Sequence, residues 1–245
     1  MFFPQLYTRT SYSLLQSTIR IREYVREAKK LGYTYLAITD EDVLYGAAEF
    51  YQECVKEGIK PIIGLHLEYT FEDKDYGLLV YAKDKIGYQQ LMNVSSKKMI
   101  EGTIELNTWT KTDHLILIVP DSHSIANDYG TAETFASHWQ MLKEKVHFHD
   151  FYVGVTGQTV SDSKEWYEFL STEEEQLCAL HPIASLHQED LFALETMKHI
   201  KEGTQISSEE LADSSQLENK NFLESESKMI QKFNERYTYK VLETT

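Results

Sequence analysis

Residues 34–69 decide the fold, and they read TYLAITDEDVLYGAAEFYQECVKEGIKPIIGLHLEY. Two runs rich in Ile, Leu and Tyr, at 34–39 and 61–71, lie on either side of a stretch at 44–56 with helical spacing. Apolar runs of this length beside Gly, Pro or Asp are typical of buried strands. Because active sites in alternating strand–helix folds lie where strands end, Thr39, Asp40 and Glu41 form a candidate site.

The same alternation continues along the chain and predicts an α/β domain with a parallel sheet or a barrel. Further strands are expected at 77–82, 115–119, 151–156 and 182–186, and further helices at 19–31, 86–99, 132–144, 164–169 and 190–201.

Composition excludes several classes of protein. The 245 residues are 42% hydrophobic, which is enough for one sizeable core, and no apolar run is long enough to span a membrane. The first residues do not read as a signal peptide. Two distant cysteines, Cys54 and Cys178, fit a reduced cytoplasmic protein. A net charge of −15 repels phosphate backbones and argues against DNA binding by this chain alone.

The character of the chain changes after residue 201. Residues 202–221 are polar and rich in Ser and Glu, as expected of a linker or a segment that wraps the surface. A short helix is expected within 222–237. The predicted organisation is therefore a domain at 1–201, a linker at 202–221 and the start of a following region at 222–245.

Several ordered blocks resemble one family. They are Ser11-Tyr12-Ser13-Leu14-Leu15, the region 32–64, Leu78 to Lys83, Gly87 to Met92, Ser95-Ser96, Glu189-Asp190, His199-Ile200, Gly203 and Phe222 to Ser225 with Met229 and Phe233. Together they resemble the PHP (polymerase and histidinol phosphatase) domain at the amino terminus of bacterial DNA polymerase III alpha subunits, the C-family polymerases. The Gram-positive branch is the most similar.

The resemblance implies a PHP-type distorted (β/α)7 barrel. It also implies a cytoplasmic parent that is a DNA-directed DNA polymerase, a nucleotidyltransferase of DNA replication. The family's palm segment and its magnesium-binding carboxylates come later than residue 245, so this chain is expected to be an inactive piece of that transferase. The expected partners are the remaining domains of the same polymerase and replisome proteins. DNA is expected to bind through the parent, and no membrane is expected.

In intact PHP domains, His, Asp and Glu hold up to three divalent metals that hydrolyse phosphoesters. The resemblance places Tyr7 and Arg9 where the family has His-x-His, and Glu41 where Thr-Asp-His ends. His66 replaces a Glu, Gly77 a His, and Pro182 and Ala184 the final Asp-x-His. Arg cannot bind a cation, and Asp40 is the one ligand that clearly remains. The resemblance thus implies a degenerate metal site.

Two interpretations of the remaining polar residues stay open. Asp40, Glu41, His66 and Glu68 are candidates for one weak residual site for Zn or Mn. Alternatively, Asp40 caps a helix or turn and pairs with Arg9, so that a salt bridge replaces the metal. The first interpretation favours a metal-dependent phosphoesterase or a 3′–5′ proofreading exonuclease. The second favours a structural or interaction module without a cofactor.

Other histidines give weaker signals. His147 and His149 have His-x-His spacing just ahead of an expected strand, where a solvated strand entry explains them as well as a metal does. Six further histidines lack ligand spacing and are expected at surface or capping positions: His114, His123, His138, His181, His187 and His199. No phosphate-binding loop or nucleophile elbow occurs in the sequence.

Overall fold

The computed structural model describes residues 2–71, 74–102, 104, 112–121, 131–145, 149–156, 177–204 and 222–236. The helices are α1 (Ile21–Lys30), α2 (Ala47–Glu57), α3 (Lys85–Glu101), α4 (Ala132–Lys145), α6 (Leu191–Glu202) and α8 (Glu226–Arg236), with a short 3-10 turn, η4 (Gln188–Asp190). The strands are β1 (Tyr35–Glu41), β2 (Lys60–Phe71), β3 (Lys74–Ala82), β4 (Leu115–Pro120), β5 (Asp150–Thr156) and β6 (Leu177–Leu180).

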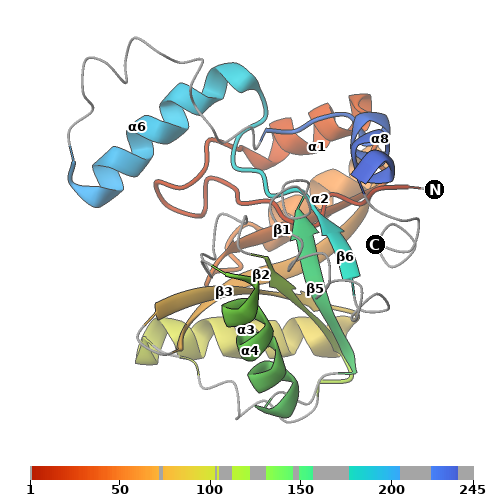
Figure 1. Ribbon diagram of the computed structural model, residues 1–245. Helices are drawn as coiled ribbons and strands as arrows, with labels where there is room; N and C mark the ends of the chain where they lie inside the picture. The colour runs from red at the N-terminus through yellow and green to blue at the C-terminus, as the bar shows by residue number, and fades with distance from the viewer. Residues whose placement is uncertain are drawn as a thin grey trace.

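These strands form one curled sheet in the order β1-β2-β3-β4-β5-β6, with helices around it (Figure 1). The α/β class predicted from the sequence is confirmed. The sheet is mixed, because β3 runs antiparallel to both β2 and β4 while the other neighbouring pairs are parallel. The link from Phe71 to Lys74 is too short for a crossover helix and therefore forces a hairpin.

An amino-terminal segment, residues 5–9, connects the two ends of this sheet. On one side, Gln5 bridges Leu36 of β1, and the amide of Thr39 donates to the carbonyl of Thr8 at 2.8 Å. On the other side, Thr8 bridges Ile183, three residues beyond β6, and the Ile183 amide donates to the Tyr7 carbonyl at 3.0 Å. The segment thus takes the place of a further strand between β1 and the chain after β6.

The last strand lies earlier than the sequence predicted. A strand was expected at 182–186, whereas β6 covers Leu177–Leu180, and Ile183 and Ser185 make isolated bridges. Pro182 has no amide hydrogen to donate to a ladder, which limits regular pairing there. The expected helix at 164–169 and residues 205–221 of the expected linker lie outside the described residues.

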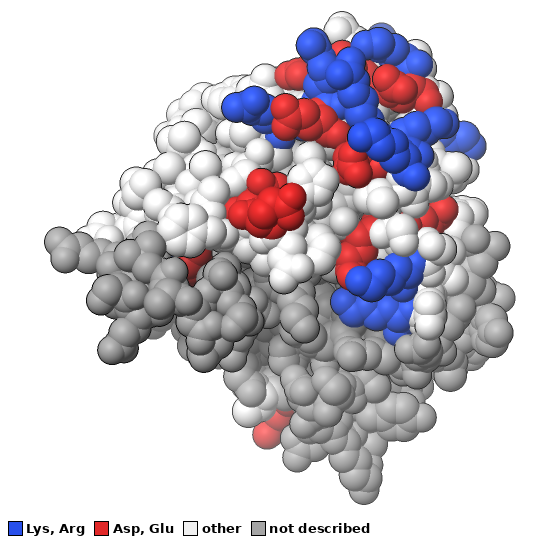
Figure 2. Space-filling view, turned by 90° about the horizontal axis from the view of Figure 1, so that it is seen from above, with Lys and Arg blue, Asp and Glu red and all other residues white. Residues whose placement is uncertain are grey.

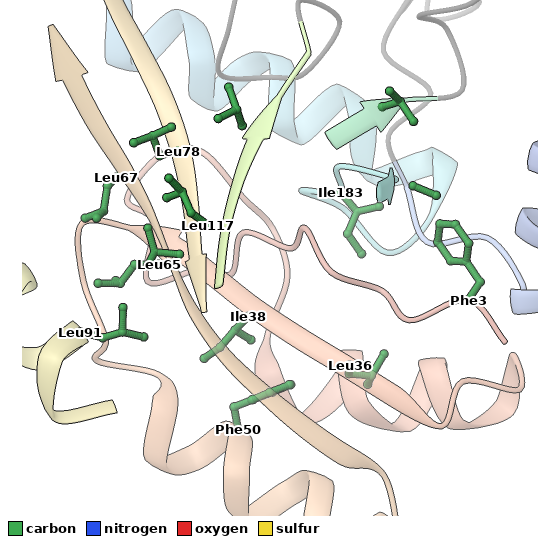
Figure 3. Packing of buried hydrophobic residues seen from close by; sticks show 14 of the residues in the cluster. Phe3, Leu36, Ile38, Phe50, Leu65, Leu67, Leu78, Leu91, Leu117 and Ile183 are labelled. Carbon is green, nitrogen blue, oxygen red and sulfur yellow. The ribbon is translucent and has the colours of Figure 1, made fainter. Parts of the chain in front are cut away.

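The two faces of the sheet bury two different cores. Alternate residues such as Leu36 and Ile38 of β1 and Leu65 and Leu67 of β2 face the helices, where they pack with Phe50 and Leu91, among others (Figure 3). The opposite face forms a smaller cluster: Leu6, Tyr7, Ala37, Leu79, Tyr81, Ile118, Cys178 and Leu180. Residues of the amino-terminal segment belong to this second cluster, so the segment covers the concave side of the sheet.

Residues beyond 221 join the same body. Leu223, Met229 and Phe233 are buried in the helix-facing core, and the ring of Phe233 lies 5.3 Å from that of Phe3. The predicted helix in this region is confirmed as α8. The proposed domain boundaries at 201 and 221 remain a prediction. Within the described residues, no helix is both long and apolar enough to cross a membrane.

We expect Gly87→Ala to destabilise the fold. A methyl group at Gly87, in the first turn of α3, would lie 2.1 Å from the carbonyl oxygen of His114. Alanine normally stabilises a helix by about 1 kcal/mol relative to glycine. The clash with fixed backbone costs about 1–3 kcal/mol and should outweigh that gain. Chemical unfolding measures the net change.

Gln89→Ala, at an exposed position of the same helix, is the matched control and should stay within about 0.5 kcal/mol of the wild type. A Gly87→Ala protein as stable as this control would show that α3 does not pack against the His114 carbonyl as described.

Candidate functional site

The carboxyl end of β1 and the middle of β2 lie beside the amino-terminal segment. Glu41 and His66 are direct partners in the parallel register of β1 and β2. The His66 ring lies 5.8 Å from the ring of Tyr7. Glu68, two residues further along β2, projects to the same side as His66. We call Tyr7, Arg9, Glu41, His66 and Glu68 the Arg9 cluster.

Arg9 occupies the centre of this cluster. It is 5% exposed, and its Nη2 lies 3.1 Å from Nδ1 of His66 and 3.7 Å from Oε2 of Glu41. Its Nη1 donates to Oε1 of Gln16 at 2.8 Å. A guanidinium has donors only, so Nδ1 of His66 must accept this hydrogen bond with its lone pair. The lone pair that a metal would use is therefore directed at a cation.

The charge state of His66 agrees with this geometry. Complete burial lowers the pKa of His66 well below its usual value, and the nearby charges of Arg9, Lys201 and Lys98 lower it further. The imidazole is therefore neutral and carries its proton on Nε2. No hydrogen-bond partner of Nε2 is present among the described residues.

Asp40 fulfils a different role from its neighbour. Its carboxylate accepts hydrogen bonds of 2.7 Å from the amide and hydroxyl of Thr10 and from the hydroxyl of Ser13. Burial raises the pKa of Asp40, and these hydrogen bonds, led by that from Ser13, oppose the rise. Asp40 thus holds the turn that follows the amino-terminal segment.

The predicted salt bridge between Arg9 and Asp40 is wrong, because Arg9 pairs with Glu41. Successive side chains of a strand point to opposite faces, so Asp40 and Glu41 cannot both face Arg9. The sequence identified the cation correctly but assigned it to the adjacent carboxylate.

Two lysines from helices place further positive charge beside the carboxylates at this end of β1. Nζ of Lys201, in the last turn of α6, lies 3.8 Å from Oε1 of Glu41. Nζ of Lys98, in α3, lies 3.9 Å from Oδ2 of Asp42 and donates to the carbonyl of Glu68 at 2.8 Å. No sequence pattern pointed to either lysine, since both lie on helices far from the strand ends in the chain.

The other degenerate positions, where the family's ligands are missing, lie around the same end of the sheet. Gly77 faces Glu68 across the β2–β3 ladder. Pro182 and Ala184 are buried on either side of Ile183, the residue that bridges Thr8. The carbonyl of Ala184 accepts a hydrogen bond from the amide of Thr18 at 3.0 Å. These positions therefore lie near one another, but the contacts described for them are made by backbone atoms.

The residues present do not fit the divalent ions that intact members of the family hold. Arg9 stands between His66 and Glu41, and both oxygens of Asp40 accept hydrogen bonds from the turn. Among the described residues, no three His, Cys, Asp or Glu side chains group in a way that could hold a metal.

Two histidines expected near the surface are buried. His138 is 1% exposed and lies between the rings of Tyr69 and Tyr76, and His181 is 5% exposed with Nε2 at 2.9 Å from the Phe222 carbonyl. The surface prediction was wrong for both, because tertiary packing decides which face is covered. His123 and His147 lie outside the described residues, whereas His149 is exposed.

Comparison with known proteins agrees with the fold and the sequence blocks. The family model described as PHP domain matches residues 5–199. The DNA polymerase III subunit alpha of Streptococcus pyogenes serotype M1 is 30% identical over 226 residues, which cover 88% of this chain and 19% of that protein. The subunit of the same name from Bacillus subtilis strain 168 is 44% identical over 99 residues, or 39% of this chain and 9% of that protein.

An amidohydrolase structure from Chromobacterium violaceum aligns with a TM-score of 0.53 at 11% identity, over 79% of this chain and 96% of that one, which supports the fold alone. This chain spans only about a fifth of the length of the streptococcal polymerase subunit, 19%.

Arg9→Met should destabilise the protein by about 2–4 kcal/mol, because it leaves His66 and Gln16 without a donor and Glu41 without its buried cation. Arg9→Lys keeps the charge but not the forked donors, so it should cost less than Met does. Chemical unfolding provides the measurement.

Arg20→Met is the control, since the Arg20 side chain is 77% exposed and pairs with Glu23 on the surface. It should change stability by less than about 0.5 kcal/mol. Equal losses of unfolding free energy in Arg9→Met and Arg20→Met would contradict the central role of Arg9.

Acid should destabilise the protein through its buried histidines. Burial lowers the pKa of His138 and of His181 to about 4, and that of His66 well below 6.5. Each stays neutral when folded but binds a proton below pH 6.5 when unfolded, so the free energy of unfolding falls as the pH drops below 6.5. Each contributes at most about 1.4 kcal/mol per pH unit. Carboxyl groups with a raised pKa, such as Glu68, have the opposite effect on the free energy of unfolding at the lowest pH values.

Chemical unfolding between pH values of about 7 and 5 measures this slope. His138→Gln should reduce the change in unfolding free energy per pH unit by the amount that one histidine contributes. His149→Gln, at an exposed position, should leave that change as it is in the wild type. A slope that His138→Gln does not alter would mean that His138 is not buried neutral.

Proposed function

This chain belongs to the PHP domain family, and we propose that it is the amino-terminal PHP domain of a bacterial DNA polymerase III alpha subunit that has exchanged its metals for internal ion pairs. The observation that carries the proposal is Nη2 of the buried Arg9 at 3.1 Å from Nδ1 of His66. A guanidinium there supplies the positive charge that divalent ions supply in members with a full ligand set.

In this proposal the domain is architectural and has no phosphoesterase or proofreading activity of its own. Arg9 lies at the end of the amino-terminal segment, which joins β1 to the chain after β6. The contacts of Arg9 with Glu41, His66 and Gln16 hold that segment across the end of the sheet. The cluster therefore stabilises the barrel, and the barrel in turn supports the domains that follow it in the polymerase.

The parent would carry out template-directed DNA synthesis with magnesium bound in its later core. The relatives' shared name and their much greater length support this assignment. The proposed partners are those later domains and, through them, replisome proteins and DNA in the cytoplasm.

The surface charge supports an indirect link to DNA. The chain carries a net charge of −15. On the face shown in Figure 2, Lys and Arg side chains are interleaved with Asp and Glu. Arg20 pairs with Glu23, Arg22 with Glu53 and Lys30 with Glu27. A mixed surface of this kind lacks the continuous positive track that non-specific DNA binding uses.

The decisive test is the metal content of the purified, untagged chain, measured by plasma mass spectrometry after dialysis against trace zinc and manganese. We expect far less than one ion per chain, and a thermal unfolding midpoint that a chelator leaves unchanged, because the counter-charge is part of the protein. Hydrolysis of a phosphodiester should not exceed that of a sample lacking the protein.

A stoichiometric ion that binds through Asp40, Glu41, His66 and Glu68 would overturn the proposal in favour of a metal-dependent phosphoesterase. Substituting His66 by Gln would identify that site, since the ion should then be lost.

A further inference from the structure

Helix α6 buries fewer of its side chains than helix α1 does. Of its residues, all of them described, only Leu191 is buried, whereas Phe192 and Ile200 are 45% and 61% exposed. By contrast, α1 buries Ile21, Tyr24, Val25 and Ala28 in the core. Among the helices and strands that the structure describes, α6 makes its most extensive contact with η4, the turn that immediately precedes it. In Figure 1, α6 stands out from the sheet at the end towards which β5 points.

The carboxyl-terminal turn of α6 nevertheless reaches the Arg9 cluster. Nζ of Lys201 lies 3.8 Å from Oε1 of Glu41. Its charge adds to the lowering of the His66 pKa that burial causes, and it opposes the rise that burial causes in the pKa of Glu68. Thr204, just past the helix, donates its amide to the carbonyl of His199 at 3.0 Å, so this end of α6 is well formed. The ion pair of Lys201 with Glu41 therefore joins the weakly packed helix α6 to the end of β1.

The three cations at this end differ in how firmly they are held. The side chains of Arg9 and Lys98 are 6% and 14% exposed, and both also make hydrogen bonds within the cluster. Lys201 is 49% exposed, and its contact with Glu41 exceeds hydrogen-bond length. An ion pair with one half-exposed partner is weak and is screened by salt. Arg9 and Lys98 are therefore fixed counter-ions, whereas Lys201 is releasable.

We infer that α6 is a salt-sensitive cover over the Arg9 cluster, fastened by the ion pair of Lys201 with Glu41. In the closed state, Lys201 and Arg9 share the two oxygens of Glu41. In the open state, the carboxylate keeps Arg9, and the Glu41 side of the cluster faces solvent. Opening leaves the amino-terminal segment in place, because its backbone pairing with β1 and Ile183 does not involve α6. This device does not depend on the proposed function.

Hydrogen exchange of the full chain, followed by mass spectrometry, tests this inference. We compare amide exchange in α6 with that in α1 for the wild type, Lys201→Gln, Glu41→Gln and the double variant. Lys201→Gln should speed exchange in α6 about two- to five-fold, the range expected for losing a half-exposed pair. Glu41→Gln also removes the carboxylate partner of Arg9, so it should speed exchange in α6 at least as much as Lys201→Gln does. Adding Lys201→Gln to Glu41→Gln should speed exchange in α6 no further. Raising the salt concentration should speed exchange in wild-type α6 in the same way.

Lys198→Gln is the matched control, because Lys198 lies on the same helix and pairs with Glu195 at 3.5 Å, away from the cluster. It should leave exchange in α6 near the wild-type rate. Three outcomes would each overturn the inference. In the first, α6 of Lys201→Gln exchanges at the wild-type rate; in the second, Lys198→Gln speeds exchange as much as Lys201→Gln. In the third, the double variant exchanges faster than Glu41→Gln does. If a variant loosens the whole fold, α1 will exchange faster as well. The salt series on the wild type then decides, and exchange in α6 that does not respond to salt overturns the inference.

Discussion

The burial of one guanidinium is the constraint on which the carboxyl end of this sheet depends. A buried arginine must have its charge and its donors satisfied, and Arg9 obtains this from Glu41, Gln16 and His66. Those partners come from β1, from the turn after the amino-terminal segment and from β2. One side chain therefore fixes the relative positions of three parts of the chain that backbone pairing alone would hold less firmly.

The same arrangement explains why neighbouring acidic residues behave so differently. Asp40 faces the turn and is satisfied by Thr10 and Ser13, whereas Glu41 faces the concave side and shares its charge between Arg9 and Lys201. Strand alternation separates the two carboxylates, although they are adjacent in sequence. A site that needs both on one ion would have to distort β1, and β1 is paired along its whole length.

Under the proposed function, the cluster is a metal site in which protein side chains have taken the place of the ions. Ions at such a site neutralise carboxylates that the fold brings together. Here side chains from the amino-terminal segment, α3 and α6 supply the positive charge instead: Arg9, Lys98 and Lys201. A side-chain cation cannot be removed by a chelator and cannot activate a bound water, so the proposed replacement would keep the fold stable without the chemistry of a metal.

The sequence by itself determined the α/β class, most of the helices and strands and the family, because these follow from local hydrophobic periodicity and from ordered blocks such as residues 34–69. It also placed a cation, Arg9, where a ligand was expected. Only the tertiary structure decided that Arg9 pairs with Glu41, that Lys98 and Lys201 join it, and that His138 and His181 are buried. Contacts of this kind join residues up to 160 positions apart, as in Glu41 with Lys201, and the packing of separate elements, which no local pattern encodes, brings such residues together.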